Sequence, residues 1–378
     1  MPSSSSPRRA DVAIRGAGVV GQALALLLAQ DRLRVALVAP ESPPRAHDVR
    51  AYALNKASRE LLVSLRAWPD AVPGAVTPVR AMQVWGDDGG QLGFDAGELG
   101  AEALAWIVDV PALEQRLADA VGFAAGVERV NEAPPARLTV VCEGRHSATR
   151  EALGIDYDTH AYPHKALAAR LRAEQPHGGV ARQWFAHGEV LALLPMGGAD
   201  GHELALVWSL PAQQADEWHK AEPAAFAEAV QARSAQALGA LTPLAPAQAW
   251  PLQLSRAQRW FTHTPQGAVA LAGDAAHAVH PLAGQGLNLG LADAAELARV
   301  LHAREYWREL GDAKLLRRYE RARAADVQAM SAVTDGLFSL FGLSDPRVQL
   351  LRNRGLAGFH RSGPLKRWFA RQAMSLSL

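Results

Sequence analysis

The sequence of 378 residues lacks several features that would assign a protein to a particular class. It has one cysteine, Cys142, so no disulfide can form within the chain, and a reducing compartment is expected. No apolar run approaches the roughly 20 residues that a membrane-spanning helix needs, which leaves peripheral membrane contact only. The thirteen histidines are scattered without metal-ligand spacing, and the Gly-x-Ser-x-Gly turn of many hydrolases is missing. We therefore expect a cytoplasmic protein with neither a metal site nor a hydrolase nucleophile.

The chain as a whole has no large excess of positive or negative charge. The chain carries 39 Lys and Arg against 38 Asp and Glu, so no overall field favours nucleic acid as a partner. From Arg299 to the end, however, 15 basic residues stand against 7 acidic ones. Residues 366–369 (KRWF) place basic beside bulky apolar side chains, a pattern that suits an anionic membrane surface or a biosynthetic complex. A helix that covers the core with a solvated basic face explains most of this segment as well.

Hydrophobic residues make up 49% of the chain and charged residues 20%, enough for a full core and two lobes. Residues 1–10 contain four Ser and two Arg but no apolar segment, so we expect a disordered tail there. A strand expected at 11–15 runs into residues 16–21 (GAGVVG), a helix follows, and a second strand is expected at 34–38. This is a βαβ unit of the length used to bind dinucleotides.

The three glycines of this turn have distinct tasks in such a unit. Gly16 permits the tight turn, Gly18 lets a pyrophosphate approach the backbone, and Gly21 lets the helix pack on the strand. The phosphate charge would lie at the helix N-terminus. A glycine-rich turn without a ligand is the alternative, and the position of the glycines between strand and helix makes it the minority interpretation.

One part of the dinucleotide pattern is missing. The second strand usually ends in an acidic residue that binds a ribose, whereas this chain has Ala39, with Glu41 as a substitute after a shift of the loop. Arg50 follows, and its guanidinium can neutralise a pyrophosphate, although a solvated surface arginine explains it equally well. The next helix is expected to carry Leu54, Leu61, Leu62 and Leu65.

The middle of the chain changes to β structure. Residues 77–100 alternate apolar and polar side chains around 87–90 (DDGG), which predicts a hairpin. Short alternating stretches between 160 and 262, interrupted by a helix at 224–238, predict an antiparallel sheet. This sheet is the candidate substrate lobe, inserted between two parts of the nucleotide lobe.

The most distinctive segment is 273–290 (GDAAHAVHPLAGQGLNLG). An apolar strand leads into it, and a Pro and Gly loop then passes into a helix. Its glycines let the backbone approach a flat ligand, Asp274 can accept hydrogen bonds from ligand hydroxyls, and the first amides of the helix face the ligand. An ordinary turn with a helix cap is the alternative, but the density of glycine favours a ligand loop.

Three segments together resemble the FAD-dependent aromatic monooxygenases, and in particular their ubiquinone-biosynthesis hydroxylase branch, which has the para-hydroxybenzoate hydroxylase fold. They are residues 16–21, 143–150 (EGRHSATR) and 273–290. Similarity elsewhere extends the resemblance to most of the chain. It implies an α/β fold with a Rossmann-like FAD-binding lobe, an inserted antiparallel β-sheet substrate lobe and a helical C-terminal region. The expected boundaries are 11–75, 105–158 and 263–310 for the FAD-binding lobe, 76–104 and 159–262 for the substrate lobe, and 311–378 for the C-terminal helices.

The resemblance also implies site residues. The three glycines at 16, 18 and 21 would hold the FAD pyrophosphate with Arg50 near it, Asp274 would bind the ribityl chain, and residues 281–288 would lie along the flavin ring. No catalytic side chain is assigned, and His164, His277 and His280 are unranked candidates for a base. The complete set of expected FAD-binding residues is Gly16, Gly18, Gly21, Arg50, Glu143, Gly144, Asp274, Pro281, Gly284, Gln285, Gly286, Leu287 and Asn288.

Several departures from the family pattern bear on FAD binding. Ala39 replaces the usual acidic residue, Glu143 stands where relatives have Asp, and Val110-Pro111 occupies a place where relatives often carry a polar flavin contact. The segment 118–137 is also too short for the β-hairpin that relatives usually have. Glu143 keeps the charge and adds one methylene, so we expect it to be tolerated.

The implied activity is hydroxylation of an electron-rich phenol, in which NADH or NADPH transiently reduces FAD and O₂ supplies the oxygen. A hydrophobic, polyprenylated phenol of ubiquinone biosynthesis is the expected substrate, because it accounts for an apolar substrate lobe and for peripheral membrane or biosynthetic-complex contact through the basic C-terminal region. Two alternatives stay open. One is a hydroxylase of a soluble aromatic substrate. The other is a non-catalytic binding or scaffold protein that kept the fold and lost FAD, as Ala39 and the short segment 118–137 would allow.

Overall fold

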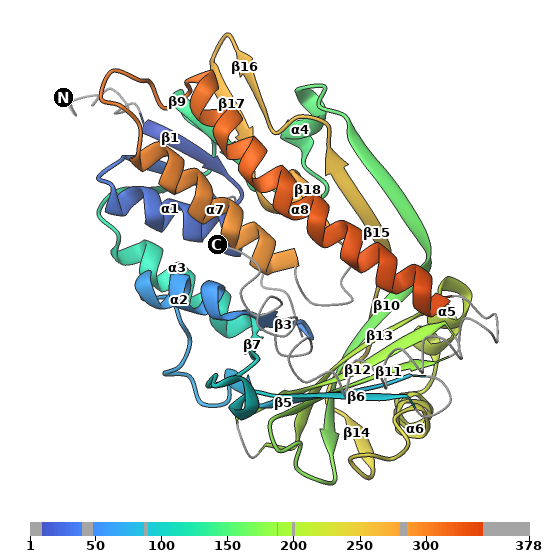
Figure 1. Cartoon of the computed structure of the whole chain (residues 1–378). Helices are drawn as coiled ribbons and strands as arrows, with labels where there is room; N and C mark the ends of the chain where they lie inside the picture. Colours follow the sequence, from blue (N-terminus) through green and yellow to red (C-terminus); the bar gives the residue numbers. More distant parts are fainter. Residues whose placement is uncertain are drawn as a thin grey trace.

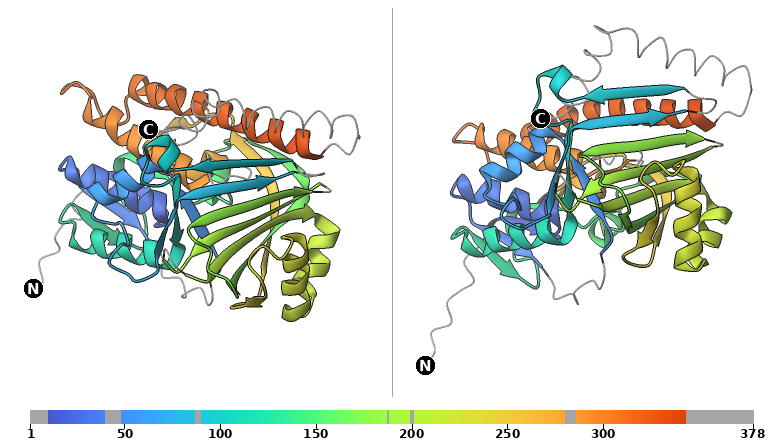
Figure 2. Two further views of the ribbon diagram at one scale, coloured as in Figure 1. Left: turned by 60° about the horizontal axis from the view of Figure 1, so that its bottom comes forward. Right: turned by 90° about the horizontal axis from the view of Figure 1, so that it is seen from below.

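A computed structural model describes residues 10–39, 48–86, 90–186, 188–198, 201–279 and 286–342. Within these ranges the chain forms a nucleotide lobe, a sheet-rich lobe and a long helix that runs from the first lobe toward the second (Figures 1 and 2). The predicted tail at 1–10 lies outside the described residues except for Ala10, which begins the first strand.

The nucleotide lobe is built on a six-stranded sheet. Five strands are parallel, and one antiparallel strand closes the edge. Most residues of the central strands are buried, as expected when helices cover both faces of a parallel sheet. In spatial order the strands are β16 (Phe261–Thr264), β17 (Gly267–Leu271), β9 (Ala136–Val141), β1 (Ala10–Arg15), β2 (Val35–Val38) and β8 (Val127–Val130).

The strand β8 fills the segment that seemed too short in the sequence. In place of a hairpin, residues 118–137 contain the end of a helix, the strand β8 and the first residues of β9, and β8 pairs in parallel with β2 at the sheet edge. The helices that pack with this sheet are α1 (Val19–Gln30), α3 (Val110–Phe123) and α7 (Gly286–His302).

A small antiparallel sheet follows the first βαβ unit. It consists of β3 (Ala51–Leu54), β7 (Ala105–Asp109) and β4 (Val76–Val79), with β7 in the centre. The expectation that Leu54 belongs to a helix is wrong, because residues 51–54 pair with β7. The helix α2 (Lys56–Ser64) begins only after Asn55, whose side chain caps it by accepting from the amide of Ser58 at 2.8 Å.

The second lobe is a nine-stranded, mainly antiparallel sheet. The hairpin predicted for 77–100 is present in it as β5 (Ala81–Trp85) and β6 (Gln91–Asp95), although the turn at 87–89 lies outside the described residues. A short helix, η2 (Gly97–Leu99), follows. The other strands are β10 (Tyr157–Ala173), β11 (Val180–Ala186), β12 (Glu189–Met196), β13 (Glu203–Pro211), β14 (Leu241–Pro243), β15 (Gln248–Ala257) and β18 (His277–Ala278).

The large sheet has two different faces. Leu206 and Trp208 of β13 point to α5 (Ala212–Lys220) and α6 (Pro223–Arg233), where Trp208 contacts Phe226. Their neighbour Ala205 points the other way and packs with Ile107 of β7 in the nucleotide lobe. Because side chains alternate along a strand, odd-numbered residues of β13 all face the nucleotide lobe. We call this surface the inner face.

The helix predicted at 224–238 ends earlier, at Arg233. Ala235 and Gln236 have left-handed backbone conformations, with φ of 50° and 54°, and cannot continue a right-handed helix.

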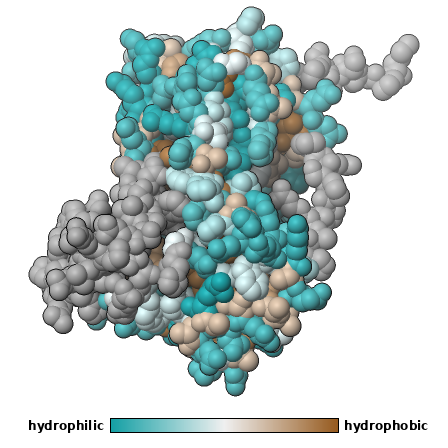
Figure 3. Space-filling model, turned by 90° about the vertical axis from the view of Figure 1, so that its right-hand side faces the viewer, coloured by the Kyte–Doolittle hydropathy of each residue, from teal (hydrophilic) through white to brown (hydrophobic). Residues whose placement is uncertain are grey.

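Seen from the side of this lobe, the described surface is mostly hydrophilic with scattered hydrophobic residues (Figure 3).

The long helix α8 (Ala313–Gly342) packs with α7 and reaches from the nucleotide lobe toward the sheet-rich lobe (Figure 1). The buried Tyr319 donates its hydroxyl to the Leu271 carbonyl at 2.9 Å and fixes the helix to β17. Of the basic residues expected on one charged segment, Arg317, Arg318 and Arg321 are exposed, whereas Arg323 points into the core. Among the described residues, no helix has both the length and the apolar character to cross a membrane.

Candidate active site

Three loops meet at the carboxyl ends of neighbouring parallel strands. Strand β1 leads into Gly16, β9 leads into Glu143, and β17 leads into Gly273. The register pairs Arg15 with Val141 and Val141 with Leu271, so the three strands end at one level. The carboxyl edge of a parallel sheet is where open α/β folds bind their ligands.

The first loop contains one glycine that leaves open space and two that the fold itself requires. A Cβ on Gly21 would lie 1.9 Å from the Gly16 carbonyl oxygen. A Cβ on Gly16, which has φ of 109°, would lie 2.4 Å from the Cys142 carbonyl oxygen. A Cβ on Gly18 would meet nothing within 4 Å. The space beside Gly18 is therefore open to a ligand.

The helix α1 begins at this open space. Gly18 is its N-cap, so within the described chain no side chain caps the first amides, and no acidic residue lies in the first turn. Free amides and the positive end of the helix dipole attract an anion. This end of α1 therefore offers a site for the predicted pyrophosphate, and that assignment stays a prediction.

Glu143 in the second loop is held by the protein itself. Its carboxylate accepts from Arg15 Nε at 3.0 Å, from the Ser147 hydroxyl at 2.7 Å, and from the hydroxyl and amide of Thr149 at 2.6 and 3.1 Å. Burial raises the pKa of Glu143, but these hydrogen bonds outweigh burial and leave the pKa below its usual range. The side chain thus orders the loop that includes Gly144 (φ 79°) and the short helix α4 (Ala148–Ala152).

Arg150 and Tyr157 join the second loop to the third, although neither was predicted as a site residue. The buried Arg150 donates to the Ala275 carbonyl at 3.1 Å and to the Arg145 carbonyl at 2.8 Å. Its guanidinium lies 3.6 Å from the Tyr157 ring centroid, and Tyr157 donates its hydroxyl to the main-chain carbonyl of Asp274 at 2.7 Å. Sequence could not reveal the contacts with Ala275 and Asp274, because these residues lie more than 100 positions away from Arg150 and Tyr157.

The side chain of Asp274 is free in the third loop, which forms the short helix η3 (Gly273–Ala275). Its carboxylate is partly buried and makes no hydrogen bond to any residue that the structure describes. Burial raises the pKa of Asp274, while His277 and Arg145 partly offset that rise. A carboxyl group without a partner among the described residues in such a place is suited to accept hydrogen bonds from ligand hydroxyls.

The start of α7 holds the last predicted site residues. A Cβ on Gly286 would meet nothing within 4 Å, and Leu287 is partly buried beside it. The Asn288 side chain donates to the Ala53 carbonyl at 2.9 Å and accepts from the Asn55 amide at 3.0 Å and from the Ser58 hydroxyl at 2.7 Å. It fixes α7 to β3 and α2, which leaves the main chain at 286–288 as the part open to a ligand. Pro281, Gly284 and Gln285 lie outside the described residues.

A buried ionic network holds the third loop from behind. Asp293 of α7 accepts from the Gly273 amide at 2.8 Å, pairs with His277 Nε2 at 2.6 Å, and pairs with Arg323 Nε at 2.9 Å. Burial opposes ionisation of Asp293, but His277 and Arg323 outweigh it and lower the pKa. Trp260 stacks on His277 with ring centroids 5.1 Å apart. This network commits His277 to structure.

The structure gives little support for His164 or His280 as a catalytic base. Burial lowers the pKa of His164, and its Nε2 lies 3.2 Å from the Gly188 carbonyl oxygen. His280 lies outside the described residues. Within the described ranges, no three His, Cys, Asp or Glu side chains are grouped as metal ligands.

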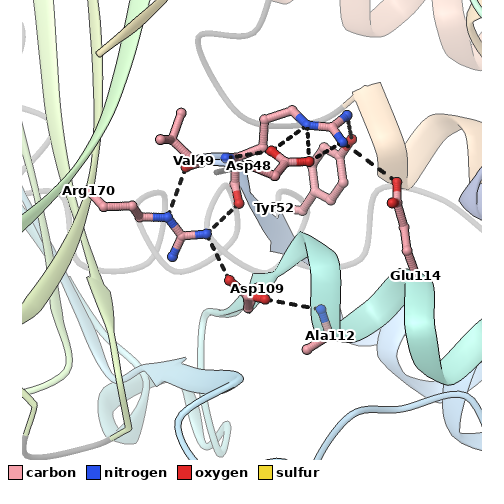
Figure 4. A network of polar contacts seen from close by, with 8 residues as sticks. Asp48, Val49, Tyr52, Asp109, Ala112, Glu114 and Arg170 are labelled. Atoms are coloured by element: carbon pink, nitrogen blue, oxygen red, sulfur yellow. Dashed lines mark hydrogen bonds and ion pairs between the residues drawn. The ribbon is translucent and has the colours of Figure 1, made fainter. Parts of the chain in front are cut away.

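Arg50 belongs to a network of polar contacts at the junction of the two lobes (Figure 4). Its guanidinium binds Asp48 at 2.8 Å and approaches Glu114 Oε1 at 3.6 Å. The hydrogen bonds to Asp48 raise the pKa of Arg50, and burial offsets only part of that rise. Arg170 of β10 donates to the Val49 carbonyl at 2.9 Å and to Asp109 at 2.9 Å. The predicted pyrophosphate contact of Arg50 stays a prediction, since carboxylates occupy the side chain here.

Comparison with known proteins decides the family. A family model described as an FAD binding domain matches residues 113–334. The ubiquinone hydroxylase UbiL of Rhodospirillum rubrum is 32% identical, over 98% of this chain and 90% of that protein. The chain belongs to the ubiquinone-hydroxylase family of FAD-dependent monooxygenases. The resemblance stated from the three segments is confirmed.

Further relatives and solved structures agree with this family. The 3-demethoxyubiquinol 3-hydroxylase of Escherichia coli is 30% identical over 97% of this chain and 98% of that protein. Pseudomonas aeruginosa PqsL in complex with 2-aminobenzoylacetate has a TM-score of 0.76 at 23% identity, covering 93% of this chain and all of that one. The p-nitrophenol 4-monooxygenase PnpA of Pseudomonas putida also reaches 0.76, at 19% identity, with 97% and 98% covered. These two structures confirm the predicted fold class.

FAD, the cofactor of the family, fits the residues present. The open space beside Gly18 and the uncapped start of α1 suit a pyrophosphate, and the free carboxylate of Asp274 suits the hydroxyls of a ribityl chain. Both features lie at the ends of strands separated only by β9. The ribose end is less complete, since Ala39 follows β2 and Glu41 lies outside the described residues.

Proposed function

We propose that this chain hydroxylates the ring of a polyprenylated phenol in ubiquinone biosynthesis, with FAD as cofactor, NADH or NADPH as reductant and O₂ as oxidant. The observation that carries this proposal is the alignment of a ubiquinone hydroxylase with 98% of the chain, including all three loops that meet at the sheet edge. The apolar residues Ala168, Ala192 and Val207 on the inner face of the large sheet support a hydrophobic substrate.

The chain's own residues have three tasks in this reaction. When bound, FAD supplies the redox chemistry, the transfer of reducing equivalents from NADH or NADPH to O₂. Asp274 and the start of α1 bind the cofactor, and the Asp293 network holds the loop that carries Asp274. The N-terminus of α7, fixed by Asn288, can stabilise negative charge through its first amides and the positive end of the helix dipole.

The inner face helps to exclude water from the reacting centre. Ala168, Ala192 and Val207 lie side by side on adjacent strands, because Ala168 pairs with Val207 and Val207 pairs with Ala192. All three are partly exposed and apolar. A ring that covers them removes water from the reacting centre, which protects reactive states of the cofactor from side reactions.

We further propose that the protein works in the cytoplasm at a membrane surface or within a biosynthetic complex, through its basic C-terminal region. The exposed Arg317, Arg318 and Arg321 on α8 support this contact. Co-sedimentation of the full chain with anionic vesicles, compared with neutral vesicles, is the test. Equal recovery of protein in the supernatant with both vesicle types would contradict membrane contact.

The absorbance spectrum of the purified protein and its NAD(P)H oxidation test the activity. We expect bound FAD, and we expect oxidation to rise when 2-farnesylphenol is added. The Asp274→Ala variant is the matched control and should lose FAD. Stimulation by soluble phenols alone would favour a soluble substrate, and a colourless protein that FAD cannot reconstitute would favour a non-catalytic role.

A further inference from the structure

One row of side chains on the inner face combines a hydroxyl with aromatic and small apolar residues. Ala166 of β10 pairs with Ser209 of β13 on one side and with Trp250 of β15 on the other. Ser209 pairs in turn with Val190 of β12, and Val190 pairs with Phe185 of β11. Residues that pair directly across a sheet project on the same face, so these five side chains form a continuous row, the Ser209 row.

The Ser209 row faces the nucleotide lobe. Ala205, four positions before Ser209 on β13, packs with Ile107 of β7, and alternation puts both on one face. Arg170, whose guanidinium reaches Val49 and Asp109 of the nucleotide lobe, pairs with Ala205 and shares that face. The row therefore lies on the side of the sheet where the cofactor lobe stands.

Ser209 carries the one hydroxyl of this row, and that hydroxyl has no hydrogen-bond partner among the described residues. The residue is only 4% exposed. A buried hydroxyl without a partner is costly, and proteins rarely keep one without a use. Ser255 of β15 is the instructive contrast, since it is equally buried but accepts from the Thr159 hydroxyl at 3.0 Å.

The neighbours of Ser209 on the inner face are small or apolar side chains. Ala166 beside it, and Ala168 and Ala192 in the adjacent row, have only methyl side chains. The larger Trp250 and Phe185 stand at the two ends of the row and are partly exposed. The row thus carries one hydroxyl among buried small and apolar side chains, with an aromatic residue at each end.

We propose that Ser209 is the residue that recognises the phenolic hydroxyl of the substrate and thereby sets how the ring is oriented on the inner face. This inference rests on the proposed function and deepens it, because it names the substrate group that the protein reads. A serine hydroxyl can both donate and accept, so it serves a neutral phenol as well as a phenolate. An aromatic ring without a hydroxyl group cannot form this hydrogen bond and gains no affinity from Ser209.

Binding of a matched pair of compounds tests this role. The FAD-loaded protein is titrated with 2-farnesylphenol and with farnesylbenzene, which differ only in the hydroxyl, and binding is followed by the flavin absorbance. We expect the wild type to bind the phenol about tenfold more tightly, the scale expected for one buried hydrogen bond. Ser209→Ala should bind both compounds about equally, whereas Ser255→Ala should keep the wild-type ratio.

Thermal unfolding separates recognition from a structural role. Removing an unpartnered buried hydroxyl should leave the unfolding temperature of Ser209→Ala unchanged or raise it. The ratio of hydroxylated product to NAD(P)H oxidised should fall in this variant, because a ring that is not oriented is hydroxylated less efficiently. Ser209→Cys, which keeps the volume with a weak donor, should lie between the two.

Two outcomes would overturn the proposal in distinguishable ways. If Ser209→Ala retains the full preference for the phenol while the wild type hydroxylates it, Ser209 has no part in recognition and the proposed function survives. If the wild type binds neither farnesyl compound, the proposed substrate class fails, and the role of Ser209 fails with it.

Discussion

At the scale of single residues, the glycines of the first loop differ in what they serve. Gly21 admits no Cβ, because the Gly16 carbonyl oxygen would be 1.9 Å away. Gly18 has open space beside it and stands at the uncapped start of α1. The structure thus separates one glycine that maintains the fold from one that leaves room for a ligand.

Alanine substitutions should reveal this difference. We expect Gly18→Ala to keep the unfolding temperature of the wild type within a few degrees and to weaken FAD binding by about tenfold or more, because a methyl group would enter the ligand space. Gly21→Ala should lower stability itself, by about 1 to 3 kcal/mol or more, since backbone must move. Differential scanning calorimetry and FAD titration measure the two quantities. Equal loss of stability in both variants would contradict the distinction.

Glu143 gives a prediction about pH. Its pKa is lowered in the folded protein by hydrogen bonds from Thr149, Ser147 and Arg15 that outweigh burial. A lowered pKa means that ionised Glu143 stabilises the fold above the ordinary glutamate pKa of 4.5, and that this contribution is lost as the pH falls through the folded value.

Glu143→Gln should therefore be less stable than the wild type by about 1.5 to 3 kcal/mol near pH 7, the range for hydrogen bonds to a charged group. The difference should shrink as the pH is lowered from 7 to below the ordinary glutamate pKa of 4.5, because the wild-type side chain takes up a proton as the pH falls through its lowered pKa. Urea unfolding at both ends of this pH range is the measurement. A difference that grows on acidification would show that the sign of the pKa shift is wrong.

At the scale of elements, α7 has contacts on every side. Gly290 lets it approach α1, since a Cβ there would lie 2.7 Å from Val20 Cγ2. Asn288 fixes its start to β3 and α2, and Asp293 joins it to the third loop and to Arg323 of α8. The position of the cofactor loop therefore depends on α8, a helix that begins 39 residues after Asp274 in the sequence.

Removing Arg323 should test this dependence. Arg323→Ala leaves the buried Asp293 without its guanidinium partner, and breaking a buried pair costs about 3 to 5 kcal/mol. The exposed Arg321, two positions earlier, is the matched control, and Arg321→Ala should change stability by less than about 0.5 kcal/mol. Chemical denaturation gives both values. Similar small effects in both variants would mean that the network does not hold the loop.

Local patterns predicted the elements better than their contacts. The strand at 11–15, the glycine turn and the hairpin at 77–100 follow from periodicity and turn residues, which act within a few positions. Residues 51–54 form a strand against expectation because their partner, β7, comes more than 50 residues later. Sequence spacing contains no information on that partner, so tertiary pairing overrode the helical pattern.

At the scale of the whole molecule, the site exists because three distant loops end on adjacent strands. Their order, β17, β9 and β1, brings together Gly273, Glu143 and Gly16. Most of the candidate site residues were predicted from the sequence, through motifs that resemble those of the family. The motifs could not show that the side chains of Glu143 and Asn288 hydrogen-bond within the protein, or that Arg150 links two loops. These contacts depend on which strands lie side by side, and the motifs do not contain that information.

The two lobes meet through contacts of one arginine as well as through apolar packing. Arg170 of the large sheet binds the Val49 carbonyl and the carboxylate of Asp109, which in turn caps α3 by accepting from the Ala112 amide at 3.0 Å (Figure 4). The inner face is thus held at a fixed distance from the segment that carries Arg50. A fixed separation of sheet and cofactor lobe is what the orientation of a substrate ring requires.

The central claim is that the chain transfers oxygen from O₂ to a polyprenylated phenol. The most direct measurement is mass spectrometry of 2-farnesylphenol after incubation with the FAD-loaded protein, NADH or NADPH, and isotopically labelled O₂. We expect a product with one added oxygen that carries the label, formed in proportion to protein and absent with Asp274→Ala. Oxidation of the reductant without any labelled product, for this phenol and for others with longer prenyl chains, would contradict it.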